Sequence, residues 1–128
     1  MPPLQNVLHV DDDDDVRSIV ELSLSLNRRL VVRQCSSGAE AVEVCREFVP
    51  DLLLLDLMMP NMSGEEAWDE IRRLPGLETV PAVFLTAKAQ TETTERLLKK
   101  GALGVISKPF DPMQIGSKLD ELWDSQIS

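Results

Sequence analysis

The chain alternates between short apolar runs and longer stretches in which apolar residues return at helical spacing. Short runs that are apolar throughout are typical of strands buried on both faces of a parallel sheet. Four of the runs end directly before a polar residue: residues 7–10 before Asp11, 52–55 before Asp56, 83–85 before Thr86 and 105–107 before Lys108. Residues 30–35, β-branched in the middle, predict one further strand.

The stretches between the runs carry helix start and stop signals. Asp13 or Asp14 can cap a first helix, and the inward stripe of that helix is expected to be Val16, Ile19, Val20 and Ser23. Second and third helices follow two S-x-x-E sequences of the capping-box form, residues 37–40 and 63–66. A fourth helix is expected from about residue 90 to Lys100, before Gly101, and Asp111-Pro112 is expected to open a fifth.

A strand followed by a helix, five times over, predicts an α/β fold. Each parallel crossover needs a helix and is right-handed, so helices should cover both faces of a five-stranded parallel sheet. The expected arrangement is the doubly wound, flavodoxin-like one, with strand order 2-1-3-4-5. We expect one domain over residues 1–128, because a chain of this length can bury roughly two thirds of its unfolded surface.

In that strand order the first and third strands are neighbours, so Asp11 and Asp12 should lie beside Asp56. Together with Lys108 they leave a net charge of −2, which one Mg²⁺ neutralises, and carboxylate oxygens are ligands that Mg²⁺ prefers. Asp13 to Asp15 are expected only to cap the first helix. A calcium loop is rejected, because its glycine and glutamate positions hold Val16 and Leu22.

A carboxylate beside a divalent cation can attack a phosphoryl group to form an acyl phosphate. Asp56 is the predicted nucleophile, since it ends the most apolar strand. Lys108 would bind one phosphoryl oxygen as a mobile point charge, and Thr86 would donate a hydrogen bond to another. Each residue type is common at strand ends, so the prediction depends on their coincidence.

These residues resemble the receiver domain of two-component response regulators, as in single-domain chemotaxis regulators, over nearly the whole chain. The matching segments, in order and at the family's spacing, are Val10-Asp11-Asp12, residues 55–60 with Gly64, Leu85-Thr86-Ala87 and residues 107–110. The resemblance implies that Asp56 is the phosphoacceptor and that Asp12, Asp56 and the backbone carbonyl of Met58 bind Mg²⁺, with Asp11 helping through water. It also implies that Thr86 and Lys108 sense the phosphoryl group and that the Lys108–Pro109 bond is cis.

The sequence departs from the family pattern at two places. Val105 stands where receivers commonly have Tyr or Phe, so we expect a smaller surface change, or one carried by backbone shifts. Met58 and Lys88 occupy positions that in the family tune the attack of water on the acyl phosphate. Because a thioether orients water poorly, we expect slow self-dephosphorylation.

Composition excludes several classes of function. A net charge of −9 and a pI near 4.5 disfavour nucleic acid and anionic membranes, and no apolar run is long enough to span a bilayer. With no leader-like start, a cytoplasmic location is the expectation. Cys35 and Cys45 are interpreted as structural thiols, and His9 as a hydrogen-bonded, partly buried imidazole rather than a phosphoryl donor. Trp68 and Trp123 are interpreted as packing residues.

The leading hypothesis is a phosphorylatable signalling switch that receives its phosphoryl group from a histidine kinase or a histidine phosphotransfer protein. It would not be an enzyme beyond assisting its own phosphorylation and dephosphorylation, and would act on an unidentified downstream protein. A homodimer is also open. The alternative is an interaction-only receiver, which Val105 favours. An aspartyl phosphatase is set aside, because such enzymes usually carry a second aspartate where this chain has Met58.

Overall fold

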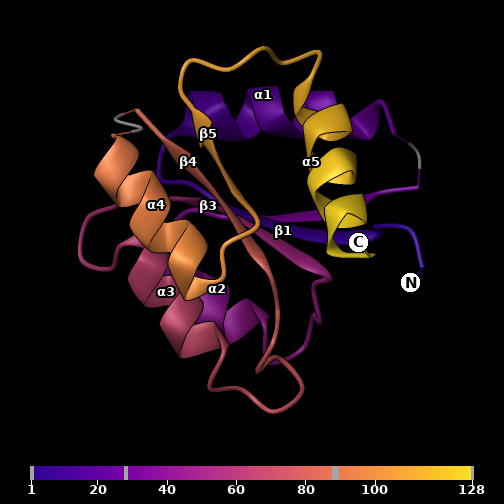
Figure 1. The fold of residues 1–128 in the computed structure, drawn as a ribbon. Helices are drawn as coiled ribbons and strands as arrows, with labels where there is room; N and C mark the ends of the chain where they lie inside the picture. Colours follow the sequence, from indigo (N-terminus) through magenta and orange to yellow (C-terminus); the bar gives the residue numbers. More distant parts are fainter. Residues whose placement is uncertain (1, 28, 88–89, 128) are drawn as a thin grey trace.

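A computed structural model describes residues 2–27, 29–87 and 90–127 of the chain (Figure 1). Strands and helices alternate along it. In order they are β1 (Asn6–Val10), α1 (Asp14–Ser25), β2 (Val31–Cys35), α2 (Gly38–Val44), β3 (Leu52–Asp56), α3 (Gly64–Ile71), β4 (Ala82–Thr86), α4 (Thr91–Lys100), β5 (Gly104–Ser107), α5 (Ile115–Asp124) and a short 3₁₀ helix, η1 (Ser125–Ile127). The predicted order of five strands, each followed by a helix, is confirmed.

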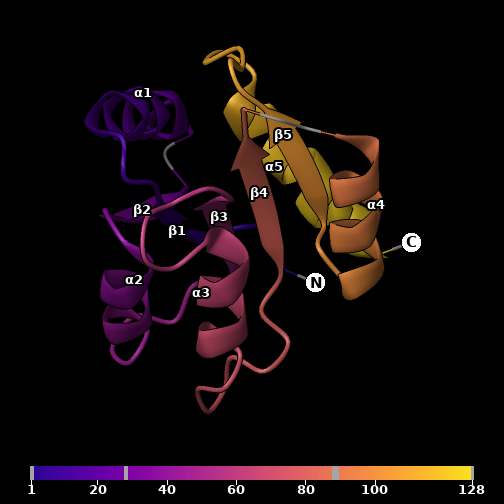
Figure 2. The ribbon, with the colours of Figure 1, turned by 90° about the vertical axis from the view of Figure 1, so that its left-hand side faces the viewer.

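The five strands form one parallel sheet in the order β2-β1-β3-β4-β5, as predicted for the flavodoxin-like fold. The central strands β3 and β4 are buried along their whole length. This burial explains their apolar sequences, because helices cover both faces of the sheet (Figures 1 and 2). All the strands run the same way, so their carboxyl ends lie at one edge.

Two hydrophobic cores lie on opposite faces of the sheet. One is built with α2, α3 and α4 and contains Trp68 and Phe84, whose rings meet edge to face at 5.7 Å. The other is built with α1 and α5, and its members include Leu24 and Trp123. Figure 2 shows α2 and α3 side by side on their face. Both tryptophans therefore pack inside the protein, as the sequence predicts.

Helix starts follow the predicted caps closely. Asp13 caps α1 by accepting from the backbone of Asp15 and Val16. Ser63 begins α3 with the complete capping box, whereas α2 has half of one. There Ser37 accepts from the Glu40 backbone, but the Glu40 carboxylate bonds to Ser36 instead of returning to Ser37. α4 ends at Gly101, as predicted, and this glycine has a left-handed conformation, φ 116°.

Two helix expectations are wrong. Ile19 does not join the inward stripe of α1; its side chain is 42% exposed, while Leu24 is buried in its place. The fifth helix does not begin at Asp111-Pro112 but at Ile115. The Asp111 side chain accepts from the backbone of Met113, and its carbonyl accepts from Gln114. Asp111 thus closes a separate turn before the helix, using the same hydrogen-bonding capacity that a cap would use.

None of the helices in the described parts of the chain combines the length and the apolar character that a bilayer crossing requires. The two cysteines, Cys35 and Cys45, are free and buried. Burial raises the pKa of the Cys35 thiol to about 12 and that of Cys45 to about 11. Both thiols therefore stay protonated at neutral pH, which fits the predicted structural role.

Candidate functional site

The polar residues that follow the apolar runs lie together at the carboxyl edge of the sheet. Asp11 comes directly after β1, Asp56 is the last residue of β3, Thr86 is the last residue of β4, and Lys108 follows β5. Asp11, Asp56 and Thr86 are buried, and Lys108 retains 19% of its side-chain exposure. The strand order brings these residues together, although they are spread over most of the chain.

Three carboxylates at this edge are close enough to share a cation. Asp11, Asp12 and Asp56 each offer an oxygen, and these oxygens lie within 4.8 Å of one another. Asp12 is exposed, while the other two are buried. Carboxylate oxygens suit a hard divalent ion such as Mg²⁺, and the exposure of Asp12 leaves one side of the site open to the water molecules that Mg²⁺ keeps. We call this group the acidic cluster.

Lys108 is the cation that the acidic cluster already contains. Its Nζ lies 3.1 Å from Asp11 Oδ2 and 3.4 Å from Asp56 Oδ1, so one ammonium is shared between two carboxylates. Burial works against the charged ammonium, but the hydrogen bond and charge of Asp11, together with the charge of Asp56, raise the pKa of Lys108. Lys108 therefore remains charged, and the cluster has a net charge of −2 when all three carboxylates are ionised.

The surroundings of the Asp56 carboxyl disfavour its ionised form. Burial, and next the charge of Asp11, raise its pKa to about 7, while Lys108 pulls it in the opposite direction. At neutral pH this carboxyl is therefore poised between its protonated and ionised forms. A bound divalent cation would favour the ionised form, which is the nucleophilic one.

The backbone around Asp56 is fixed by a close approach of α3. A Cβ added to Gly64 would lie 2.3 Å from the carbonyl oxygen of Asp56, so only glycine allows this contact. Gly64 N also donates to the carbonyl of Leu57 at 3.1 Å, and Met58 N donates to Asp56 Oδ1 at 3.3 Å. Met58 is 70% exposed, and the one heteroatom of its side chain is a weakly accepting sulfur.

Sequence reasoning missed two residues that support the acidic cluster. Arg17 donates from NH1 to the backbone carbonyl of Asp11 at 2.6 Å, which ties α1 to the end of β1. Gln34 donates to His9 Nδ1 at 3.0 Å and to the carbonyl of Arg17 at 2.8 Å. The only signal for Gln34 was a polar residue inside a predicted strand. His9 is fully buried, which exceeds the partial burial expected from sequence.

The remaining sequence-predicted features are placed as follows. The Lys108–Pro109 peptide bond is cis, as the resemblance implies. Val105 is a partly buried residue of β5 that pairs with Phe84 in β4. Lys88 lies outside the described residues.

Comparison with known proteins points in one direction. A family model of the response regulator receiver domain matches residues 7–120. A protein of Leptolyngbya boryana, named an uncharacterized 14.6 kDa protein in the sodA1 3′ region, is 34% identical over 110 residues, which are 86% of this chain and 83% of that protein. The solved structure of the chemotaxis protein CheY4 of Vibrio cholerae has a TM-score of 0.84 and 27% identity, covering 93% of this chain and 98% of that one.

Other similar proteins are much longer than this chain. The hybrid signal transduction histidine kinase D of Dictyostelium discoideum is 33% identical over 117 residues, which are 91% of this chain but 7% of that protein. The chain likewise spans 23% of a probable cyclic di-GMP phosphodiesterase of Vibrio cholerae, at 35% identity over 103 residues. The region shared with these longer proteins is therefore a small part of each.

Proposed function

Because the chain belongs to the response regulator receiver domain family, we propose that it is a phosphorylatable switch of a two-component phosphorelay, with residues 1–128 acting as one receiver domain. Asp56 accepts a phosphoryl group from a histidine kinase or a histidine phosphotransfer protein, and the phosphorylated form binds a downstream protein. The observation that supports this most directly is the convergence of Asp56 with Asp11, Asp12 and Lys108 at one edge of the sheet.

In the proposed transfer, an oxygen of Asp56 attacks the phosphorus of a phosphohistidine. The new P–O bond forms as the P–N bond breaks, and the imidazole of the donor leaves with the electron pair. Lys108 already lies 3.4 Å from Asp56 Oδ1, so a small movement brings its ammonium to a phosphoryl oxygen. Thr86, at the end of the neighbouring strand, would donate a hydrogen bond to a second oxygen.

The acidic cluster fits the metal that this chemistry needs. Asp11, Asp12, Asp56 and the backbone carbonyl of Met58 would hold Mg²⁺, with Asp11 acting through water. When bound, Mg²⁺ neutralises charge on the phosphoryl oxygens during transfer. Two observations support a divalent cation here: three carboxylates face one ammonium, and after burial it is the charge of Asp11 that most raises the pKa of Asp56, to about 7.

A direct test is incubation with Mg²⁺ and acetyl phosphate, followed by intact-mass measurement. We expect the mass of one phosphoryl group to be added to the wild-type protein and to the control Asp124→Asn, whose carboxylate is exposed at the end of α5. Asp56→Asn should gain none. Equal gain in Asp56→Asn would place the phosphoryl group on another residue and overturn the proposed role of Asp56.

An interaction-only receiver is the second candidate, and Val105 is the observation that favours it. At this position the surface formed by α4, β5 and α5 carries a small aliphatic side chain, which has less area than an aromatic ring to bury or expose on phosphorylation. This candidate expects no phosphoryl gain in either the wild type or Asp56→Asn. A receiver that gains the group but keeps its partner affinity unchanged would also favour it.

Turnover of the phosphoryl group is expected to be slow. Met58 is exposed beside Asp56 and cannot hold a water molecule for attack on the acyl phosphate. We predict that Met58→Asn, which adds an amide that can orient water, shortens the lifetime of the phosphorylated form at least about tenfold. Loss of label after removal of acetyl phosphate measures this, and a wild-type lifetime of only seconds in Mg²⁺ would contradict the prediction.

The proposed partners of the switch follow from the family and from the net charge. The phosphoryl donor is proposed to be a histidine kinase or phosphotransfer protein, and the downstream partner a protein rather than nucleic acid, given the net charge of −9. Homodimerisation and a cytoplasmic location stay predictions from the sequence.

A further inference from the structure

His9 is the single histidine of the chain, and the transfer chemistry described above does not use it. It lies in β1, two residues before Asp11, and is fully buried. Among the described residues, its Nε2 is the one buried side-chain nitrogen or oxygen that lacks a hydrogen-bond partner. Such a group costs stability in a folded protein, so its presence beside a functional site calls for an explanation.

Gln34 fixes which ring nitrogen of His9 carries the proton. His9 and Gln34 are partners in the register of β1 and β2, and the Gln34 amide nitrogen lies 3.0 Å from His9 Nδ1. The same nitrogen donates to the backbone carbonyl of Arg17 at 2.8 Å. Turning the amide round would set its oxygen against that carbonyl, two acceptors facing each other, so the nitrogen must lie on this side.

With the amide in that orientation, His9 Nδ1 must accept a hydrogen bond and therefore carries no proton. The imidazole is then neutral, with its proton on Nε2. Consistent with this, burial, followed by the charges of Lys108 and Arg17, lowers the pKa of His9 to about 3. The ring is thus a neutral hydrogen-bond donor.

The donor faces the acidic cluster. His9 Nε2 lies 3.9 Å from Asp11 Oδ2, too far for a hydrogen bond and near enough for one after a small shift. The same oxygen now accepts from Lys108 Nζ at 3.1 Å. The other oxygen of Asp11 accepts from the backbone of Asp13 at 2.9 Å. Two donors therefore lie near Asp11 Oδ2: Lys108 Nζ, which is hydrogen-bonded to it, and His9 Nε2, which is not.

Phosphorylation of Asp56 would change which donor is engaged. The added group places negative charge farther out than the Asp56 carboxylate, and Lys108 is the mobile cation that can follow it. If Lys108 leaves, the buried Oδ2 of Asp11 loses its hydrogen bond, which is costly for an ionised group.

We propose that His9 is a positioning residue for Asp11, held by Gln34 with its proton on Nε2, and that it replaces Lys108 as the donor to Asp11 Oδ2 when Lys108 turns to the phosphoryl group. This inference rests on the proposed function. The proposal gives the buried, unpartnered Nε2 of His9 a role, because this donor forms its hydrogen bond in the phosphorylated state. It also explains a polar pair, His9 and Gln34, inside an otherwise apolar region of the sheet.

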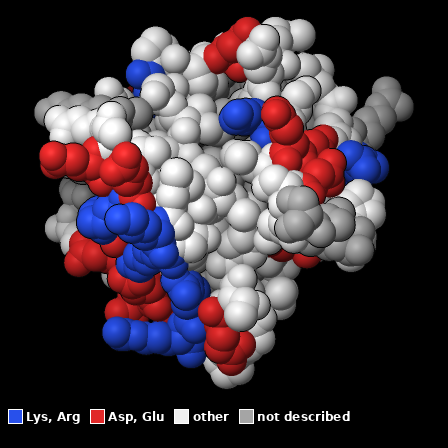
Figure 3. All heavy atoms as spheres, viewed as in Figure 1, with Lys and Arg blue, Asp and Glu red and all other residues white. Residues whose placement is uncertain are grey.

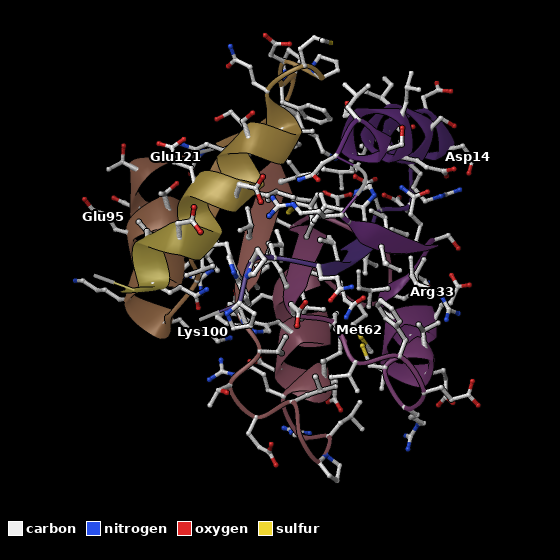
Figure 4. All side chains as sticks on the ribbon, turned by 90° about the vertical axis from the view of Figure 1, so that its right-hand side faces the viewer. Asp14, Arg33, Met62, Glu95, Lys100 and Glu121 are labelled. Carbon is white, nitrogen blue, oxygen red and sulfur yellow. The ribbon has the colours of Figure 1, made fainter. Side chains whose placement is uncertain are left out.

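Nitrogen NMR of the ¹⁵N-labelled protein tests the first half of the proposal, because a single histidine gives a single pair of ring signals. We expect Nδ1 to have the shift of an unprotonated ring nitrogen and Nε2 that of a protonated one. Gln34→Met removes the amide and should let both tautomers appear. The matched control is Arg33→Met, in the same strand, since Arg33 lies over the Phe48 ring, 5.3 Å from its centre, and toward α2 in Figure 4. A proton on Nδ1 in the wild type overturns the proposal.

Adding Mg²⁺ with beryllofluoride, a mimic of the phosphoryl group, tests the second half. We expect the Nε2 proton to move downfield and its exchange with water to slow about tenfold or more as the new hydrogen bond forms. His9→Leu should fold, because the site is buried, yet bind beryllofluoride about tenfold more weakly. Binding without any change at Nε2 overturns the role of His9 alone. Failure of beryllofluoride to bind the wild type overturns the proposed function, and the exchange of donors with it.

Discussion

Two groups of carboxylates and cations in this protein differ in their balance of charge and in the direction in which their carboxyl pKa values are shifted. One is the acidic cluster with Lys108. The other joins α3 to α4, and we call it the α3–α4 ion cluster. Arg96 and Lys100 contact Glu65 at 2.7 and 3.0 Å, and Lys100 contacts Asp69 at 2.8 Å. Figure 3 shows this cluster as adjoining blue and red atoms along the side of the molecule that carries α3 and α4.

The carboxyl pKa values of the two groups move in opposite directions. Hydrogen bonding from Arg96, the largest influence, lowers the pKa of Glu65 to about 2, although burial opposes it. Burial and the charge of Asp11 raise the pKa of Asp56 to about 7. The α3–α4 ion cluster is balanced, with two cations facing two carboxylates. The acidic cluster has three carboxylates and only Lys108 to face them, an excess of two negative charges when all three are ionised. An imbalance kept in a buried place indicates a ligand, while a balanced surface network indicates structure.

The largest expected effect is a gain of stability on removing the charge of Asp56. Because the folded pKa is raised above 3.8, this group's contribution to stability is fully present below about pH 4 and is lost as the pH rises through about 7. Asp56→Asn should therefore be more stable than the wild type by about 2–4 kcal/mol above pH 7, and the difference should shrink towards pH 4.

Denaturant unfolding from pH 4 to pH 8 in the presence of a chelator measures this difference, with Asp124→Asn as the control. The control should follow the wild type across the whole range. A constant gap between Asp56→Asn and the wild type would mean that the Asp56 carboxyl titrates alike in the folded and unfolded chains. The contrast between the two clusters would then be lost.

Magnesium should produce the next largest effect, and only at the acidic cluster. A ligand that binds only the folded state stabilises it by about 2.7 kcal/mol at a concentration one hundred times its Kd. We expect Mg²⁺ to raise the melting temperature of the wild type and of Glu65→Gln alike. Asp12→Asn, which removes the exposed ligand, should respond much less. An equal response of Asp12→Asn and the wild type would place the ion elsewhere.

The fold could be predicted from sequence because its signals are local. Apolar runs such as residues 52–55 mark strands that are covered on both faces, and Ser63 with Glu66 marks a helix start whose capping box is complete in the structure. The start of α5 could not be found in this way. Asp111 has the same hydrogen-bonding capacity in a turn as in a cap, so the residue type alone does not decide between them.

The convergence of Asp11, Asp12, Asp56 and Lys108 could also be predicted, since strand order alone brings strand ends together, and the structure places these residues side by side. Their roles in metal binding and phosphoryl transfer stay predictions. The support from Arg17 and Gln34 could not be predicted. It depends on the register of β1 against β2 and on where α1 lies over them, which no single segment specifies.

The smallest expected effect belongs to the α3–α4 ion cluster. Its charges are partly exposed, so Glu65→Gln should cost only about 0.2–1 kcal/mol, and less in high salt, because screening weakens surface pairs.

The folded pKa of Glu65 is lowered, so its contribution is present above about pH 4.5 and lost as the pH falls towards about 2. The sign of this pH dependence differs from that of Asp56. In acid the wild type loses the favourable charge of Glu65, so its stability advantage over Glu65→Gln disappears. In acid the wild type also loses the unfavourable charge of Asp56, so the stability advantage of Asp56→Asn disappears. Paired denaturation curves at low and high salt, with Glu121→Gln on the exposed side of α5 as the control (Figure 4), measure both features. A cost above about 2 kcal/mol that resists salt would show that this network is as strongly coupled as the acidic cluster, and that charge balance does not separate the two.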